Sequence, residues 1–80
     1  MNRKETAQIL KILKSAYPNM YSRVTKIEAK EIIALWQDLF DKDNFSDVMK
    51  AVKLYIVTDK KGCPPSIGMI KQKMSEIEKE

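Results

Sequence analysis

The sequence predicts an all-α fold, a small orthogonal bundle of three to four helices. Apolar residues recur at spacings of three and four over most of the chain, which is the period of one buried helix face. Polar breaks that carry capping residues or proline separate these stretches. The 80 residues suffice for one small domain, and 44% apolar with 32% charged residues disfavours both a disordered chain and a membrane span.

The first helix is expected from about Lys4 to Ala16, with Asn2 as its N-cap. Pro18 ends this helix because the residue before a proline, here Tyr17, is disfavoured in the helical conformation. A short link from Asn19 to Val24 follows. The apolar face of the helix contains Ile9, Leu10, Ile12, Leu13 and Ala16.

The second helix begins at a capping box, in which Thr25 and Glu28 each satisfy an amide of the first turn. Its apolar pattern is the strongest periodic signal in the chain, and we therefore expect this helix to form the centre of the core. The face contains Ala29, Ile32, Ile33, Trp36, Leu39 and Phe40.

A polar break at Asp41–Asn44 offers caps for a third helix. Leu54 and Val57 widen the apolar face of this helix, and such a wide face predicts contact with two neighbours. The rest of the face contains Phe45, Val48, Met49, Val52, Tyr55 and Ile56.

The segment Thr58–Ile67 combines residues that stop and restart a helix. Gly62 can adopt the left-handed conformation that ends a helix after Lys60 and Lys61, whose charges favour the carbonyl end. Two successive prolines then prevent continuation, and Ser66 is placed to cap the next helix.

The last segment has a narrow apolar seam two heptads long. We expect a compact helical domain over residues 1–66 and a carboxy-terminal helix over 67–80 that packs on the core, packs on a partner or frays. Completion of the core by Ile67 and Ile70 and contact with a partner remain alternatives. The seam contains Ile67, Ile70, Met74 and Ile77.

The residue content argues against catalysis. Histidine is absent, which removes the commonest metal ligand and general base, and no glycine-rich phosphate-binding loop is present. Asp41 and Asp43 alternate like the first ligands of a calcium loop, but Phe45 and Val52 occupy later ligand positions. We expect no enzyme activity, no metal and no cofactor.

Cys63 is the only cysteine, so no intramolecular disulfide forms and a reducing, cytoplasmic compartment is expected. Nearby lysines could activate its thiol. Because no histidine can serve as its base, we expect a partly buried, unreactive side chain instead.

Two function classes fit the pattern: a protein-interaction module, and a small basic helical domain for DNA binding or transcription regulation. The net charge of +4 comes from 15 basic and 11 acidic residues that are interleaved without a basic block. The third helix lacks the Arg, Asn and Gln side chains that read base edges, so direct DNA binding is not expected. The candidate nucleic-acid face is Lys50, Lys53, Lys60 and Lys61.

Landmarks along nearly the whole chain carry a family resemblance. The most specific is the ending of the pattern Thr58-Asp59-x-x-Gly62-x-Pro64-Pro65-Ser66-Ile67-Gly68. The earlier landmarks are Ala16-Tyr17-Pro18, the Tyr21 turn, Leu35-Trp36 with Phe40, and Val48 with Ala51 and Val52. With these landmarks, the chain resembles the loader-and-inhibitor proteins of phage replicative helicases.

The resemblance implies an accessory protein of phage or prophage DNA replication in the bacterial cytoplasm. In that family, a small helical domain precedes a flexible extension that engages a hexameric DnaB-type helicase; this sequence stops at Glu80. The implied activities are to bind the helicase, hold it inactive and deliver it to an origin-bound initiator, without ATPase activity. We expect any helicase contact of this chain on the flank of the last helix, at Lys71, Met74 and Ile77.

Overall fold

A computed structural model describes residues 1–78, and these residues form five helices and no strand. The predicted all-α class is confirmed. The last two residues of the predicted carboxy-terminal segment lie outside the described part. The helices are α1 (Arg3–Ala16), α2 (Pro18–Tyr21), α3 (Lys26–Leu39), α4 (Phe45–Thr58) and α5 (Ile67–Glu78).

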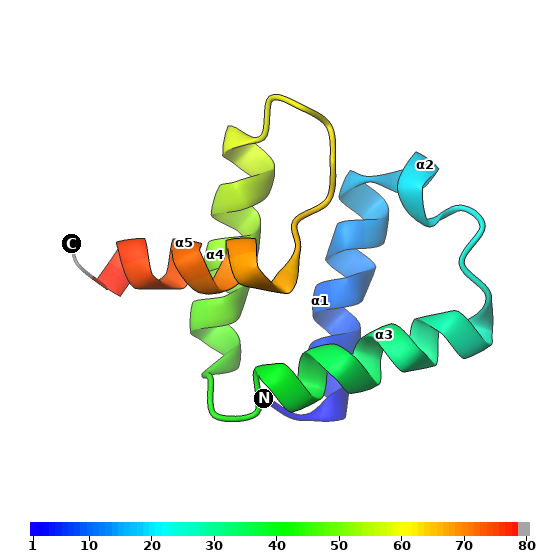
Figure 1. Ribbon diagram of the computed structural model, residues 1–80, viewed down its shortest axis with the longest axis horizontal. Helices are drawn as coiled ribbons and strands as arrows, with labels where there is room; N and C mark the ends of the chain where they lie inside the picture. The colour runs from blue at the N-terminus through cyan, green and yellow to red at the C-terminus, as the bar shows by residue number, and fades with distance from the viewer. Residues whose placement is uncertain (79–80) are drawn as a thin grey trace.

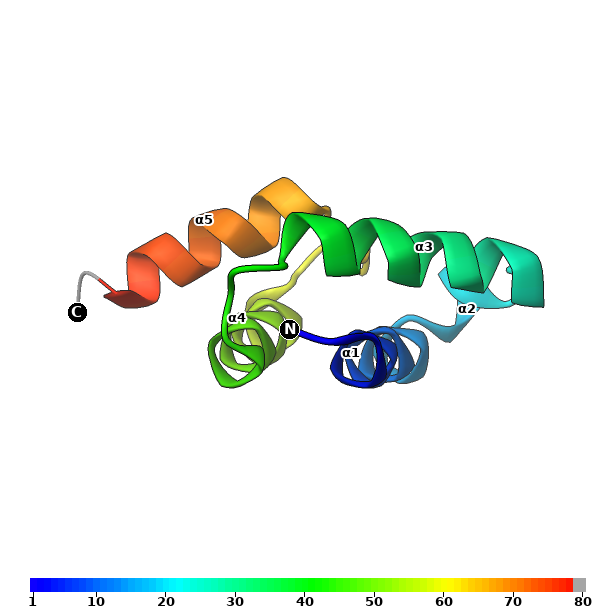
Figure 2. The same ribbon diagram turned by 90° about the horizontal axis from the view of Figure 1, so that it is seen from below.

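The four long helices form two layers. Helices α1 and α4 lie side by side in one layer, and α3 and α5 form the other layer (Figures 1 and 2). Helix α3 packs across α1 and α5 packs across α4, both at a steep angle (Figure 1). This arrangement is the expected orthogonal bundle.

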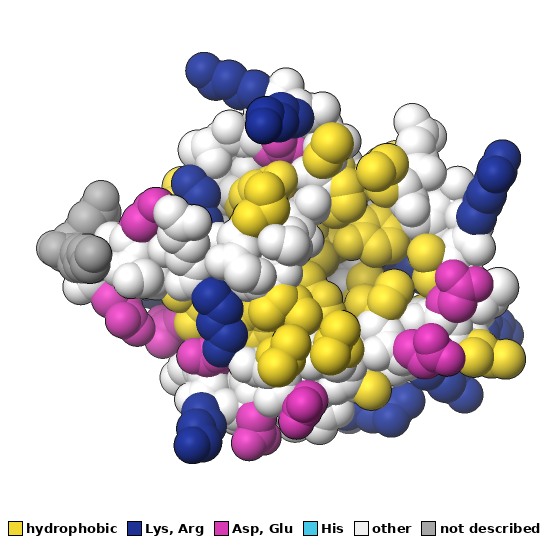
Figure 3. All heavy atoms as spheres, in the orientation of Figure 1, with side chains coloured by type: hydrophobic (Ala, Val, Ile, Leu, Met, Phe, Trp, Pro, Cys, Tyr) yellow, Lys and Arg dark blue, Asp and Glu magenta, His cyan; other side chains and the backbone are white. Residues whose placement is uncertain are grey.

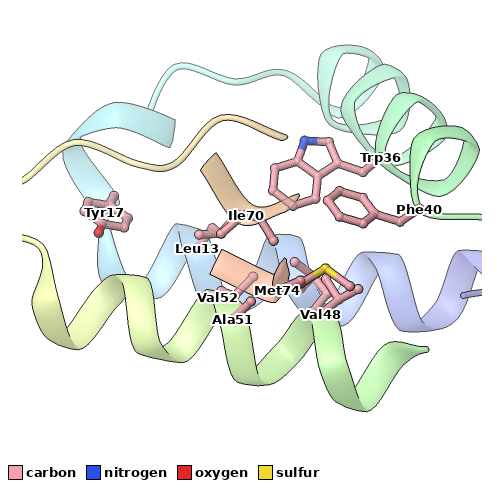
Figure 4. Close-up of a cluster of buried hydrophobic side chains, with 10 residues drawn as sticks. Leu13, Tyr17, Trp36, Phe40, Val48, Ala51, Val52, Ile70 and Met74 are labelled. Atoms are coloured by element: carbon pink, nitrogen blue, oxygen red, sulfur yellow. The ribbon is translucent and has the colours of Figure 1, made fainter. Parts of the chain in front are cut away.

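The core fills the space between the layers, and side chains from α1, α4 and α5 meet there with two aromatic rings (Figure 4). Phe40 is fully buried, and its ring stacks on that of Trp36 with 5.2 Å between ring centroids. The buried apolar residues are Ile9, Leu10, Leu13, Tyr17, Trp36, Phe40, Val48, Ala51, Val52, Ile70 and Met74.

The expectation that the second predicted helix forms the centre of the core is wrong. Within α3, Trp36 is the one buried residue, and Phe40 follows at its C-cap. Leu39, expected in the core, is 46% exposed. The reason is geometric: α3 crosses α1 on the outside of the bundle, so only its end reaches the other helices (Figure 2).

The outer edge of the wide α4 face is also exposed. Helix α4 contacts both α1 and α5, as the width of the face predicted. However, neither neighbour covers Leu54 or Val57, which are 39% and 81% exposed. The expected burial of these two side chains is therefore wrong.

Helix caps follow the sequence closely, with one exchange. Asn2 caps α1 and forms a full capping box with Glu5: each side chain accepts a hydrogen bond from the other residue's backbone amide, at 2.8 and 2.9 Å. At α3, the amide of Glu28 donates to the Thr25 hydroxyl, but that hydroxyl itself lies 3.2 Å from the Glu28 carboxylate. The predicted box at α3 is thus only half formed.

The link after α1 contains the one-turn helix α2, which the sequence analysis treated as irregular. Pro18 is its first residue, where the missing amide of proline costs no hydrogen bond. Tyr17 between the two helices leaves the helical region, as predicted, with φ −127° and ψ 61°.

Helix α4 ends earlier than the sequence indicated. Its last residue is Thr58, and Asp59 is already extended with φ −72° and ψ 122°. Gly62 does have the predicted left-handed conformation, with φ 73°, but it bends the linker rather than ending the helix. Ser66 accepts the Met69 amide at 3.3 Å and caps α5 as expected.

We expect Gly62→Ala to destabilise the fold by about 1–2 kcal/mol, because an L side chain is strained in the left-handed region. A Cβ at this position would meet no atom within 4 Å, so no clash adds to this cost. Urea unfolding measures the change. Gly68→Ala is the matched control: Gly68 is helical, and the substitution should be neutral or stabilise by up to about 1 kcal/mol. Equal losses in both variants would contradict the strain argument.

Candidate interaction surfaces

The linker between α4 and α5 is held to the body by two tyrosines. The Tyr17 hydroxyl donates to Asp59 Oδ2 at 2.8 Å, and the Tyr55 hydroxyl donates to the Cys63 carbonyl at 2.7 Å. The Lys61 amide donates to Asp59 Oδ1 at 3.0 Å. Sequence analysis assigned neither hydroxyl; the available signal was that a tyrosine on a buried face needs a polar partner.

These contacts shift the pKa values of both members of the first pair. Burial raises the pKa of Tyr17, and the hydrogen bond to Asp59 and its negative charge raise it further. Partial desolvation raises the pKa of Asp59, but the bonds from Tyr17 and from the amides of residues 61–63 outweigh it, so the net pKa is lowered. Because the native pKa of Asp59 lies below its unfolded value, its ionised form stabilises the fold above about pH 4, and this contribution is lost as the pH falls through the native pKa.

We therefore expect Tyr17→Phe to be less stable than the parent at pH 7, and the difference to shrink below about pH 4 as Asp59 becomes protonated. Thermal melts across this pH range measure both stabilities. Tyr21→Phe is the matched control, because Tyr21 has no carboxylate partner among the hydrogen bonds of residues 1–78. A loss in Tyr17→Phe that does not depend on pH would contradict this role of Asp59.

The three residues expected to contact the helicase differ in their environments. Lys71 is exposed, forms an ion pair with Asp43 and lies over the Phe40 ring, 4.6 Å from its centroid. Ile77 is half-buried against the core. Met74 is buried, so its expected exposure is wrong: the seam of α5 faces α4 rather than solvent.

The four lysines of the alternative nucleic-acid face fall into two places. Lys50 and Lys53 lie on exposed positions of α4, and Lys60 and Lys61 lie beyond its end. The second pair lines one open hollow together with Lys73 of α5, which sequence reasoning did not place there. Only the packing of α5 on α4 brings Lys73 to this position.

Cys63 is exposed, so the prediction of a partly buried side chain is wrong. The pinned linker turns it outward while Pro65 is buried in its place. Within residues 1–78 there is no group of three or more His, Cys, Asp or Glu side chains that could hold a metal ion.

An apolar surface covers the face that α3 and α5 present. Figure 3 shows hydrophobic side chains gathered along α3 and around a hollow between α3, α2 and the linker. Leu35 and Leu39, four residues apart on α3, are 54% and 46% exposed. Met20 of α2 is also exposed and lines a neighbouring hollow of roughly 460 Å³ with Tyr17, Ile56 and Gly62. Exposed apolar surface of this kind is typical of binding sites.

These features define a small all-α domain of the interaction type. Comparison with protein families gave one finding: the family model for the N-terminal domain of a phage helicase loader/inhibitor matches residues 1–71. The chain belongs to this helicase loader/inhibitor family, and the resemblance seen in the sequence is confirmed. The match covers α1 to α4 and ends within α5.

Searches of curated proteins and of solved structures gave no match. In the part of the chain that the structure describes, none of the helices has the length and apolar character needed to cross a membrane.

Proposed function

We propose that this protein binds a DnaB-type replicative helicase, holds it inactive and delivers it to an origin-bound initiator during phage or prophage replication in the bacterial cytoplasm. It acts stoichiometrically and without catalysis of its own. The observation that carries the proposal is the family match over residues 1–71, since the family is that of a helicase loader/inhibitor.

The proposed contact lies where α3 meets α5. Leu39 and Lys71 line one shallow hollow there, with Asp43 beside them. Leu39 supplies exposed apolar area and Lys71 a charge that can exchange its intramolecular partner for one on the helicase. Ile77 extends this surface along α5, and Met74 supports it from below through its contacts with the core.

Titration of the purified protein into the cognate helicase tests this proposal, with helicase ATPase activity and size-exclusion chromatography as readouts. We expect a stoichiometric complex with reduced ATPase activity, which Leu39→Ser and Lys71→Glu weaken. Ile27→Ser and Lys30→Glu are matched controls on exposed positions of the same layer. Unchanged ATPase activity together with no complex would refute the function. A complex insensitive to Leu39 and Lys71 would refute the surface alone.

A further inference from the structure

The outer strip of α4, formed by Lys50, Lys53, Leu54 and Val57, has no role in the fold. These residues are spaced by three, four and seven, so they share one side of the helix. The opposite side supplies Val48, Ala51 and Val52, each fully buried, to the core. With 81% of its side chain exposed, Val57 is more exposed than any other large apolar residue in residues 1–78.

The strip is bordered by positive charge that the protein leaves unpaired. Lys50 and Lys53 flank the two aliphatic residues, and Lys60 and Lys61 follow just beyond the helix end. The two ion pairs within residues 1–78 are Lys71–Asp43 and Lys73–Glu76, so neither uses these four lysines.

Two carboxylates lie near the outer strip, and neither neutralises it. Asp59 is occupied by Tyr17 and by linker amides. Asp47 lies one turn before Lys50 in the first turn of α4, where it favours the positive end of the helix dipole. The strip therefore combines an aliphatic centre with a net positive rim.

We propose that the outer strip of α4 docks an acidic amphipathic helix of a partner protein. An aliphatic centre requires apolar side chains opposite it, and the lysine rim requires carboxylates on either side of them, the pattern of a helix with an apolar seam and acidic flanks. A nucleic acid would satisfy the lysines only: its phosphates offer nothing to Leu54 and Val57, and the strip carries no aromatic ring or arginine for base contacts.

This surface is separate from the helicase surface proposed above. Helix α4 belongs to the layer formed with α1, whereas Leu39 and Lys71 lie on the layer of α3 and α5 (Figure 2). The inference rests on exposure and charge alone, and it holds whether or not the helicase is the partner of the other face.

Fluorescence anisotropy with a labelled synthetic helix tests the inference. The probe carries leucines at positions i, i+3 and i+7 between glutamates, and a second peptide replaces the leucines with serines. We expect the leucine peptide to bind the intact protein, with an affinity that falls as ionic strength rises. Val57→Glu should weaken binding at least about tenfold, because it places a like charge in the apolar contact. Val57→Ser should weaken it less.

Ile27→Glu on α3 is the matched control, because Ile27 is 72% exposed and lies outside the strip. Equal binding of the two peptides, or equal binding by Val57→Glu and Ile27→Glu, would overturn the proposal. Tighter binding of a single-stranded oligonucleotide of the same charge, unaffected by Val57→Ser, would also overturn it and assign the lysines to nucleic acid. Circular dichroism confirms that each variant is folded.

Discussion

Phe40→Ala should unfold most easily of all single truncations in this domain, with a loss of about 3–5 kcal/mol. The side chain is fully buried, stacks on Trp36 and lies under Lys71, so its removal leaves a cavity where α3 meets the other helices. An 80-residue domain has a total stability of about 4–12 kcal/mol, so this loss is a large part of it. Urea unfolding followed by Trp36 fluorescence measures the change.

Leu39→Ala is the control for this experiment, because Leu39 is the preceding residue and is 46% exposed. It should cost about 1 kcal/mol or less. If Phe40→Ala does not fold, Phe40→Leu keeps the test usable with an expected loss of roughly 1–2 kcal/mol. Similar losses from Leu39→Ala and Phe40→Leu would contradict the burial difference on which this prediction depends.

Ile70→Ala should release α5 from α4, with a loss of about 2–5 kcal/mol. Ile70 is fully buried in the core cluster, next to the seam residue Met74 (Figure 4). Because a helix of 12 residues is marginal in water, α5 depends on this packing for its structure. Amide hydrogen exchange measures the effect directly, and amides of α5 should exchange faster while those of α1 change less.

The matched control is Ile77→Ala near the end of α5, where the side chain is only half-buried. It should change exchange in the last turn alone and cost clearly less stability than Ile70→Ala. Uniform acceleration in all helices of the Ile70→Ala variant would mean that α5 unfolds only with the whole domain. That result would contradict the release of α5 as a separate step.

Local features of the fold were predictable from the sequence. Asn2, Thr25 and Ser66 cap the helices to which they were assigned, and Pro18 separates α1 from the next turn. Gly62 is left-handed as expected. Each of these outcomes depends on hydrogen bonds or steric contacts within a few residues, so the neighbouring sequence contains the necessary information.

The burial of individual faces was less predictable. The apolar periodicity of α3 is as strong as that of α4, yet Leu39 and Leu35 are exposed whereas Val48 and Val52 are not. Periodicity identifies which side of a helix is apolar, but the crossing position decides how much of that side a neighbour covers. The same limit applies to Met74, whose burial follows from the way α5 lies on α4.

The candidate surfaces divide in the same way. The chain by itself determined the family, through the Pro64-Pro65-Ser66-Ile67 landmark and the helices before it, and it indicated that Lys50, Lys53, Lys60 and Lys61 could act together. The tertiary structure decided that Leu54 and Val57 remain uncovered between these lysines and that Tyr17 holds Asp59. Caps, turns and motifs are set by near neighbours along the chain, whereas exposed faces and long-range hydrogen bonds depend on which helices pack together.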